Sequence, residues 1–264
     1  KETTVLDEVF YKNLIPGKEY TVHGKLMVKE TGEPLTVNGK EVTAEKTFVA
    51  EEADGSIILE FTFDSSALAG KHIVAFEDVE YKGISIGTHA DLEDEDQTIS
   101  YPEIHTSAVD QASGSKTMVL GTGVTLVDTV SYKGLTAGKT YVVKGTIMDK
   151  ASGESIGVTA ETTFVAEAAD GQTTVTFTFD TSRLEGKTLV VFETLYDEQG
   201  NQLVDHKDLN DTDQTVTVPV KPQNPPVVTG DDSTPMPYVL ALSAALLAVL
   251  AVVAVLVKRR RKQA

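Results

Sequence analysis

A set of short motifs occurs twice in this chain, in the same order and at nearly the same spacing. The clearest pairs are Leu-Ile-Pro-Gly-Lys-Glu-Tyr (14–20) with Leu-Thr-Ala-Gly-Lys-Thr-Tyr (135–141), Thr-Phe-Val-Ala-Glu (47–51 and 163–167) and Phe-Thr-Phe-Asp (61–64 and 177–180). A repeat of domain length means that one folding unit is present twice. We therefore divide the outer part of the chain into copy one, residues 1–100, and copy two, residues 101–220.

Both copies have the sequence pattern of β-strands. Residues 57–63 and 173–179 alternate polar and apolar side chains and are rich in β-branched and aromatic types. Turn sequences such as Ala-Asp-Gly (53–55 and 169–171) interrupt the strands at short intervals. No sustained helical periodicity is found before residue 221. The sequence predicts an all-β fold of two tandem immunoglobulin-like β-sandwiches.

The two copies differ in two places. The segment 32–42 of copy one is longer than the matching segment 153–158 of copy two. We expect a loop there, because loops absorb length changes. Copy one also lacks a counterpart of residues 104–122, a stretch long enough for one or two strands. We expect copy one to be truncated on its N-terminal side, with the chain beginning inside it.

The C-terminal part of the chain has the pattern of a membrane anchor. Residues 238–257 carry no charge and are rich in Leu, Val and Ala. As a helix this segment would rise about 30 Å, the thickness of a bilayer core. The basic cluster at 258–262 follows directly, and the positive-inside rule places such a cluster in the cytoplasm. We predict one transmembrane helix at 238–257, a cytoplasmic tail at 258–264 and both copies outside the membrane.

Residues 221–237 are rich in proline, which favours an extended, semi-rigid spacer. Their Thr229-Gly230, followed by the apolar span and the arginine-rich tail, resembles a sortase cell-wall sorting signal. The resemblance implies cleavage between Thr229 and Gly230 and attachment of Thr229 to peptidoglycan or to another surface subunit. Pro226 and Val227 stand where the usual motif has Leu-Pro. The alternative is a single-pass membrane protein in which Thr-Gly occurs by chance.

The composition excludes several classes of function. The chain has no cysteine, which excludes disulfides, thiol catalysis and thiolate metal sites. Its formal net charge is −17, and the acidic excess is larger still outside the basic tail. Because such a surface repels phosphate backbones, we expect no nucleic-acid partner. We also expect no cofactor.

Four residues whose side chains could take part in a reaction recur at matched positions of the two copies. The pairs are Asp7 and Asp128, Glu77 and Glu193, His89 and His206, and Gln97 and Gln214. The histidine precedes the glutamine by eight positions in each copy. Both glutamates follow apolar strand sequences, so we expect their side chains to lie toward the core rather than in water.

Taken together, these motifs resemble the VaFE repeat of Gram-positive surface proteins, also called the ester-bond or Thr–Gln domain. The resemblance rests on Val-Ala-Phe-Glu (74–77), with Asp-x-Val-x-Tyr upstream and His-x-Asp and Gln-Thr downstream. It covers all of copy two and nearly all of copy one. The family implies an immunoglobulin-like fold locked by a self-made ester bond between a threonine of the first strand and a glutamine of the last.

In copy two, the resemblance assigns Thr106 as the nucleophile and Gln214 as the acceptor. The assisting residues that it implies there are Asp128, Glu193 and His206. The matching residues of copy one are Asp7, Glu77, His89 and Gln97. Thr3 and Thr4 align with positions 124 and 125, so the threonine of copy one is expected before Lys1.

These residue types suit ester formation. A threonine hydroxyl becomes a useful nucleophile when a base such as His206 takes its proton. A glutamine amide reacts when its carbonyl is polarised or its leaving nitrogen is protonated. Asp128 and Glu193, held together away from water, would share a proton and supply a neutral acid. Which group acts as acid and which as base stays open at this stage.

The same residues also fit less specific interpretations. A histidine on an acidic loop is usually solvated, and a metal site of His206, Asp205 and Asp208 would have no recognised spacing. His23 and His72, like His105, have no matching counterparts, and we expect all three at the surface.

The sequence thus predicts a structural stalk segment of a cell-wall-anchored adhesin or pilus-like protein, stiffened by intramolecular Thr–Gln ester bonds. Its expected location is the cell surface of a Gram-positive bacterium. A hydrolytic enzyme is disfavoured, because the nucleophile and its acceptor come from one domain and allow a single turnover. A ligand-binding adhesin domain on a simple membrane anchor is the alternative, and the ligand of any N-terminal region is not readable.

Overall fold

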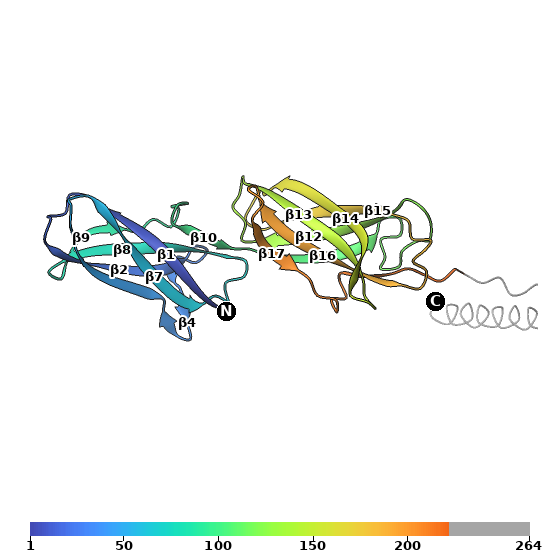
Figure 1. Ribbon diagram of the computed structural model, residues 1–264, viewed down its shortest axis with the longest axis horizontal. Coiled ribbons are helices and arrows are strands. Elements are labelled where there is room, and N and C mark those ends of the chain that lie inside the picture. Colours follow the sequence, from blue (N-terminus) through green and yellow to red (C-terminus); the bar gives the residue numbers. More distant parts are fainter. Residues whose placement is uncertain (222–264) are drawn as a thin grey trace, which may run out of the picture. The chain divides into compact units, whose positions relative to one another are not determined.

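The computed structural model describes residues 1–221, which are strands and their connections, with no helix among them (Figure 1). The strands of copy one are β1 (Glu2–Tyr11), β2 (Glu19–Val28), β3 (Glu33–Pro34), β4 (Thr36–Val37), β5 (Lys40–Glu41), β6 (Thr43–Val49), β7 (Gly55–Asp64), β8 (Lys71–Tyr81), β9 (Ile84–His89) and β10 (Thr98–Tyr101). Those of copy two are β11 (Glu103–Asp110), β12 (Val124–Lys133), β13 (Thr140–Asp149), β14 (Glu154–Val165), β15 (Gly171–Phe179), β16 (Thr188–Asp197), β17 (Gln202–His206) and β18 (Thr215–Thr217). The predicted all-β class is confirmed.

Copy two is a sandwich of two antiparallel sheets. One sheet has the order β11-β12-β15, and the other has the order β14-β13-β16-β17, with β18 also paired to β16. Alternate residues of each strand face the space between the sheets, because side chains of a strand alternate between its two faces. Leu126 of β12, Phe177 of β15 and Ile147 of β13 are almost fully buried there.

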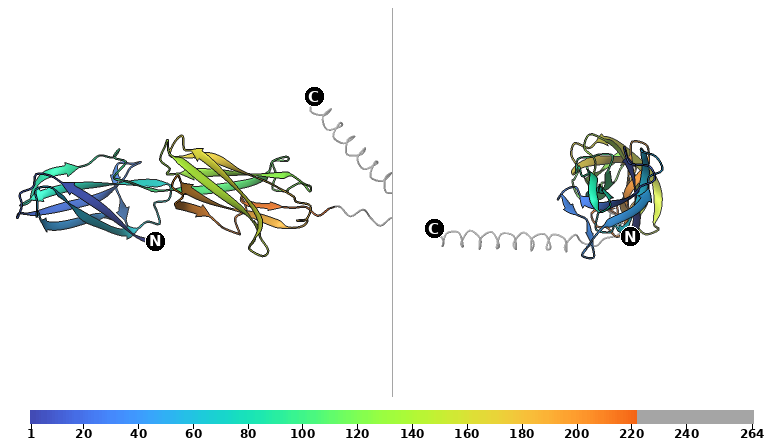
Figure 2. Two further views of the ribbon diagram at one scale, coloured as in Figure 1. Left: turned by 45° about the horizontal axis from the view of Figure 1, so that its top comes forward. Right: turned by 90° about the vertical axis from the view of Figure 1, so that its left-hand side faces the viewer.

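Copy one repeats this arrangement of two facing sheets, but its smaller sheet has one strand fewer. Figure 2 shows both copies from two further sides. Strands β10-β8-β2-β3 form its larger sheet, in which β6 also pairs with β2 and β9 with β8. The facing sheet contains only β1 and β7, which correspond to β12 and β15. Among the described residues, copy one has no counterpart of β11, so one edge of β1 has no neighbouring strand.

The length difference between the copies lies where the sequence places it. Copy two passes directly into the long strand β14, whereas copy one inserts the small hairpin β4–β5 before β6. The expected loop therefore contains a short hairpin. Positive φ angles at Asn38 and Gly39 close this hairpin, and both residue types tolerate that conformation.

A glycine on the central strand of each larger sheet is required by packing. Gly24 pairs with Glu77, and Gly145 pairs with Glu193. A β-carbon on Gly24 would lie 2.6 Å from the ring of Phe61, and a β-carbon on Gly145 would collide with Phe177. The glycines therefore let an aromatic ring from the opposite sheet pack directly against the backbone beside each glutamate.

Three predicted features lie outside the described residues. They are the spacer with Thr229 and Gly230, the transmembrane helix at 238–257 and the basic tail. Within residues 1–221 there is no helix of the length and apolarity needed to cross a membrane.

Candidate functional site

Three of the predicted site residues of copy two come from strands and face the space between the sheets. Thr106 shares the inner face of β11 with Ile104 and Ala108, and Asp128 lies between buried residues of β12. Glu193 shares the inner face of β16 with Val191 and Leu195, as its position after an apolar run predicts. Period-two alternation therefore carries a hydroxyl and two carboxyls into an apolar core.

The other two residues come from the C-terminal end of the copy. His206 ends β17 and pairs across the ladder with Glu193. Gln214 directly precedes β18, and its backbone carbonyl oxygen accepts a hydrogen bond from the backbone amide of Val191 at 3.1 Å. Thr106 thus belongs to one sheet and Gln214 to the other. We call Thr106, Asp128, Glu193, His206 and Gln214 the polar cluster.

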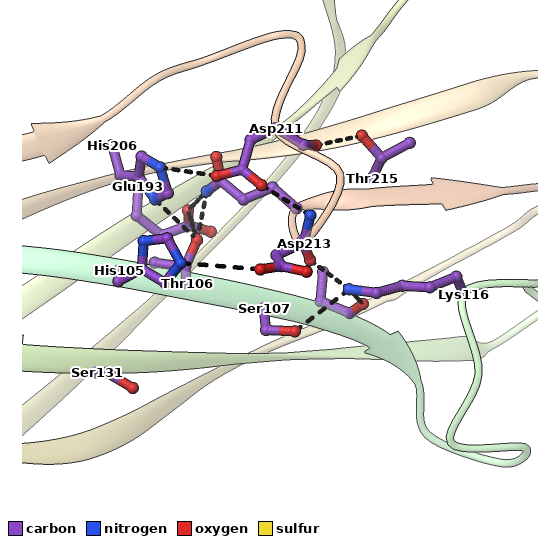
Figure 3. Close-up of polar contacts among 12 residues, drawn as sticks. His105, Thr106, Ser107, Lys116, Ser131, Glu193, His206, Asp211, Asp213 and Thr215 are labelled. Atoms are coloured by element: carbon purple, nitrogen blue, oxygen red, sulfur yellow. Dashed lines mark hydrogen bonds and ion pairs between the residues drawn. The ribbon is translucent and has the colours of Figure 1, made fainter.

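Within the polar cluster, the side chain of Thr106 lies beside those of Glu193 and His206 (Figure 3). The Thr106 hydroxyl lies 3.1 Å from Glu193 Oε2, to which it donates, and 3.4 Å from His206 Nδ1. The Gln214 amide nitrogen donates to Glu193 Oε2 at 2.6 Å and also to the Thr106 hydroxyl oxygen. Thr106 is 1% exposed, and Asp128, Glu193 and Gln214 are fully buried. The hydroxyl, the amide and the carboxyl pair therefore meet in a space that excludes water.

The burial of the two carboxyls favours a protonated form of the pair. Burial, followed by the neighbouring carboxyl of Asp128, raises the pKa of Glu193 to about 11. Burial also raises the pKa of Asp128. Both Asp128 oxygens and Glu193 Oε1 are buried without a hydrogen-bond partner. A proton shared by the pair gives partners to two of these oxygens and avoids two adjacent buried charges.

Asp211 completes the environment of His206, and our sequence analysis missed it. Its carboxylate lies 3.0 Å from His206 Nε2. One ring nitrogen of His206 therefore faces a carboxylate, and the other, Nδ1, faces the Thr106 hydroxyl. The signal was present in the sequence, because an aspartate follows the histidine by five positions in both copies, as Asp94 after His89 and Asp211 after His206.

Lys116 fixes the first strand against the segment that carries Gln214. Its ammonium group donates to the Ala108 carbonyl at 2.8 Å, to the Ser107 hydroxyl at 3.2 Å and to the Asp213 carbonyl (Figure 3). The Ala108 amide also donates to the Asp213 carbonyl at 2.9 Å. These contacts flank Thr106 on one side and Gln214 on the other, so they hold the two side chains in register.

Residues 1–101 and residues 102–218 each match the family described as T-Q ester bond containing domain. This chain belongs to that family. The resemblance stated from the sequence is therefore confirmed for both copies. No curated protein matches the chain.

Solved structures of bacterial surface proteins are similar to the chain at a lower level. One is a bacterial adhesin from Mobiluncus mulieris containing intramolecular disulfide, isopeptide and ester bond cross-links, at 18% identity and a TM-score of 0.40, covering 46% of this chain and 58% of that chain. Another is the C-terminal domain of the Streptococcus agalactiae AgI/II polypeptide BspA, at 10% identity and a TM-score of 0.35, covering 83% of this chain and 93% of that chain. The chain thus spans 58% of the length of the adhesin structure.

The first T-Q domain, copy one, brings together the four residues expected there, with a more open geometry. Asp7 and Glu77 are buried, and burial, then Asp7, raises the pKa of Glu77 to about 8. His89 contacts Glu77 Oε2 at 3.2 Å and Asp94 at 3.0 Å. The His89 side chain is 45% exposed, against 18% for His206, and Gln97 is only partly buried. The acceptor half of the site is present, and no counterpart of Thr106 is found among the described residues.

The metal set considered from the sequence does not assemble. Asp205 contacts Lys207 and Gln202, and Asp208 accepts a hydrogen bond from the Asn210 amide. Of the residues described, His105, His206 and Asp211 have ligand atoms within 4.8 Å of one another. This set overlaps the base of the T-Q site, so it forms part of that site rather than a separate one.

Two of the three unmatched histidines lie at the surface, as expected. The side chains of His23 and His105 are 41% and 66% exposed. The expectation was wrong for His72, which is buried and contacts Glu30 at 2.7 Å. His72 lies on β8 opposite Ser100 of β10, and the pairing of these strands covers it.

Proposed function

We propose that copy two forms an ester bond between Thr106 and Gln214, and that this bond stiffens a stalk segment of a cell-surface protein. One observation carries the proposal. The hydroxyl of Thr106 contacts the side-chain amide of Gln214, across two sheets, in a buried cluster that also contains an imidazole and a pair of carboxyls.

The proposal gives each group a role that its position supports. His206 Nδ1 takes the proton of the Thr106 hydroxyl, and Asp211 stabilises the resulting imidazolium. The hydroxyl oxygen attacks the side-chain carbonyl carbon of Gln214 and forms the new C–O bond. Because Glu193 is protonated and lies beside the amide nitrogen, it acts as the acid that protonates this nitrogen as the C–N bond breaks.

Atoms balance in this scheme. One hydroxyl and one primary amide give one ester and one ammonia, and the proton on His206 returns to the carboxyl pair. The ester would be retained because Thr106, Gln214 and the two carboxyl residues beside them are 0–1% exposed, which keeps hydrolytic water away. Each domain reacts once, so the protein is not a catalyst in the usual sense.

The position of the bond in the chain supports a mechanical role. Thr106 lies near the start of copy two and Gln214 near its end, 108 positions further along the chain. Tension on the chain would pass through the ester and bypass the strands in between. We infer a load-bearing stalk, joined to peptidoglycan or to another subunit through Thr229 by a sortase and held before that by the membrane helix. A ligand-binding adhesin domain without a cross-link is the second candidate.

The decisive measurement is the intact mass of the full chain. The wild type should lack one ammonia relative to its sequence, and proteolysis should yield a linked peptide pair containing Thr106 and Gln214. Thr106→Val removes the nucleophile but keeps the shape, so the folded variant should retain the ammonia. Thr125→Val, on the neighbouring strand, is the matched control and should lose it. A wild type with its full unmodified mass would refute the proposed bond.

The anchoring part of the proposal has its own test. Protein extracted from the cell wall should end at Thr229, without residues 238–264. Replacing Thr229 and Gly230 by alanine should move the protein to the membrane fraction or the medium. Wall-extracted protein that keeps the arginine-rich tail would leave only a membrane anchor.

A further inference from the structure

Two histidines and an aspartate meet where strand β11 of one sheet of copy two lies against strand β17 of the other. His105 lies on β11, His206 ends β17, and Asp211 lies between β17 and β18. The rings of His105 and His206 stack with their centroids 5.2 Å apart, and His206 Nε2 lies 3.0 Å from Asp211 Oδ2 (Figure 3). One ligand atom from each residue lies within 4.8 Å of the others. Two imidazoles and a carboxylate therefore surround one point at the rim of the T-Q site.

These are the donor types that Zn²⁺ prefers. Zn²⁺ binds imidazole nitrogen and carboxylate oxygen in a tetrahedral arrangement, which places neighbouring ligand atoms about 3.4 Å apart. The contact of His206 with Asp211 is close to that spacing. His105 can rotate toward them because its side chain is 66% exposed, and Asp213, 3.8 Å from His105 Nε2, is within reach of the fourth position. Ca²⁺ and Mg²⁺ fit less well, because they take oxygen ligands.

The surroundings hold His206 in an orientation that suits a metal ligand. The second ring nitrogen of a metal-bound histidine usually contacts an oxygen atom, and this contact fixes the ring. His206 Nδ1 has such a partner in Thr106 Oγ1 at 3.4 Å. The side chains of His206 and Asp211 are 18% and 14% exposed, so they are packed in place and an ion can still reach them from solvent. Four aspartates within residues 205–213 add negative charge that attracts a cation.

We propose that copy two binds one Zn²⁺ ion through His105, His206 Nε2 and Asp211, and that this ion clamps β11 to β17. Because the ligands come from both sheets, the ion would tie the first strand of the domain to the opposite sheet. This metal clamp is separate from the Thr106–Gln214 bond, and it needs only the positions of its ligands.

The order of the two events rests on the proposed function. An ion on Nε2 prevents His206 from becoming an imidazolium, so zinc binding and ester formation exclude one another at the same moment. The reaction uses His206 and Asp211 once and makes neither of them part of the bond. Both residues are then available to the ion, so the ester forms first and the metal clamp follows.

The experiment titrates ZnCl₂ into the full chain, produced without a histidine tag and freed of metal with EDTA, by isothermal titration calorimetry. We expect one ion to bind per chain and excess CaCl₂ not to displace it. His105→Ala removes one exposed ligand and should weaken zinc binding at least about 10-fold. His23→Ala is the matched control, because His23 is also an exposed strand histidine beside carboxylates, and it should bind zinc as the wild type does.

Equal zinc affinity of the wild type and His105→Ala, or displacement of zinc by CaCl₂, would show that surface carboxylates hold the ion and would overturn the site. Hydrogen exchange of a Thr106→Val chain tests the clamp without the ester. There ZnCl₂ should slow the exchange of the β11 amides, and adding His105→Ala should remove this effect. Exchange that zinc leaves unchanged would overturn the clamp.

The intact mass of the same wild-type sample separates this inference from the proposed function. Zinc binding by a chain that retains its ammonia would support the metal site and refute the ester bond. A chain that has lost its ammonia but binds no zinc would overturn the metal site and leave the proposed function standing.

Discussion

Glu193 and Asp128 lie side by side in an apolar core, and this placement keeps at least one of them uncharged at neutral pH. An isolated buried carboxylate would be strongly destabilising, so the folded domain retains a proton that the unfolded chain releases. The same proton is the one that the leaving nitrogen of Gln214 requires. Burial of the two carboxyls thus costs stability and also retains the proton that the proposed reaction needs.

This retained proton predicts a pH dependence in a Thr106→Val chain, which cannot cross-link. The ordinary pKa of Glu193 is 4.5, and the folded value is about 11. Between these values the folded state binds more protons than the unfolded state, so the stability of copy two should fall as pH rises. We expect hydrogen-exchange protection of β12 and β16, corrected for intrinsic rates, to decrease from about pH 5 to about pH 9.

The control variants are made in the same background. Adding Glu193→Gln should flatten the pH dependence, because the glutamine has no proton to lose. Adding Glu77→Gln in copy one should leave the pH dependence of copy two unchanged. Protection of copy two that rises over this range would mean that Glu193 is charged in the folded state.

At the level of the elements, the site depends on how closely two sheets approach. Gly145 of β13 pairs with Glu193 of β16, and the Phe177 ring of the opposite sheet occupies the space that a β-carbon would need. Thr106 and Gln214 belong to opposite sheets, so the sheet spacing sets their separation. A change in the core therefore acts on the reaction without touching a reactive group.

Gly145→Ala should show this coupling. We expect a loss of about 1–3 kcal/mol in the stability of the uncross-linked domain, as for other overpacked cores. The fraction of freshly purified protein that retains its ammonia should rise, because the sheets are forced apart at the site. Gly157→Ala, at an exposed position of β14 with open space around it but a positive φ, is a control that strains the backbone away from the core. Equal effects of both variants on the ammonia loss would contradict the spacing argument.

For the whole molecule, the proposed bond changes which part of copy two can be unfolded. The loop that it closes spans 108 positions, and by analogy with disulfides such a closure stabilises a domain by up to about 4–5 kcal/mol. Under tension the effect is larger, because a covalent bond carries the force in place of hydrogen bonds. The loop residues would then be shielded from the load.

Single-molecule pulling on the chain should detect this shielding. In the wild type we expect no extension step from residues 107–213, and in Thr106→Val a step whose length corresponds to most of copy two. Copy one has no such bond within residues 1–101 and should extend in both proteins, which provides an internal reference. A wild-type trace with two domain-sized steps would show that copy two carries no cross-link.

Much of the fold and of the site can be predicted from the sequence, because alternating strand residues and a duplicated set of motifs are strong local patterns. The all-β class, the inward direction of Glu77 and Glu193 and the family membership all follow from such patterns. Local patterns also contained the aspartate five positions after each histidine, although its role was not recognised without the geometry.

Other features were decided only by the tertiary structure, because they depend on strands that are distant in sequence. The sequence does not show that Lys116 would hold β11 against Asp213, or that His72 would be covered by the pairing of β8 with β10. The choice of His206 as base and Glu193 as acid required the distances to Thr106 and Gln214.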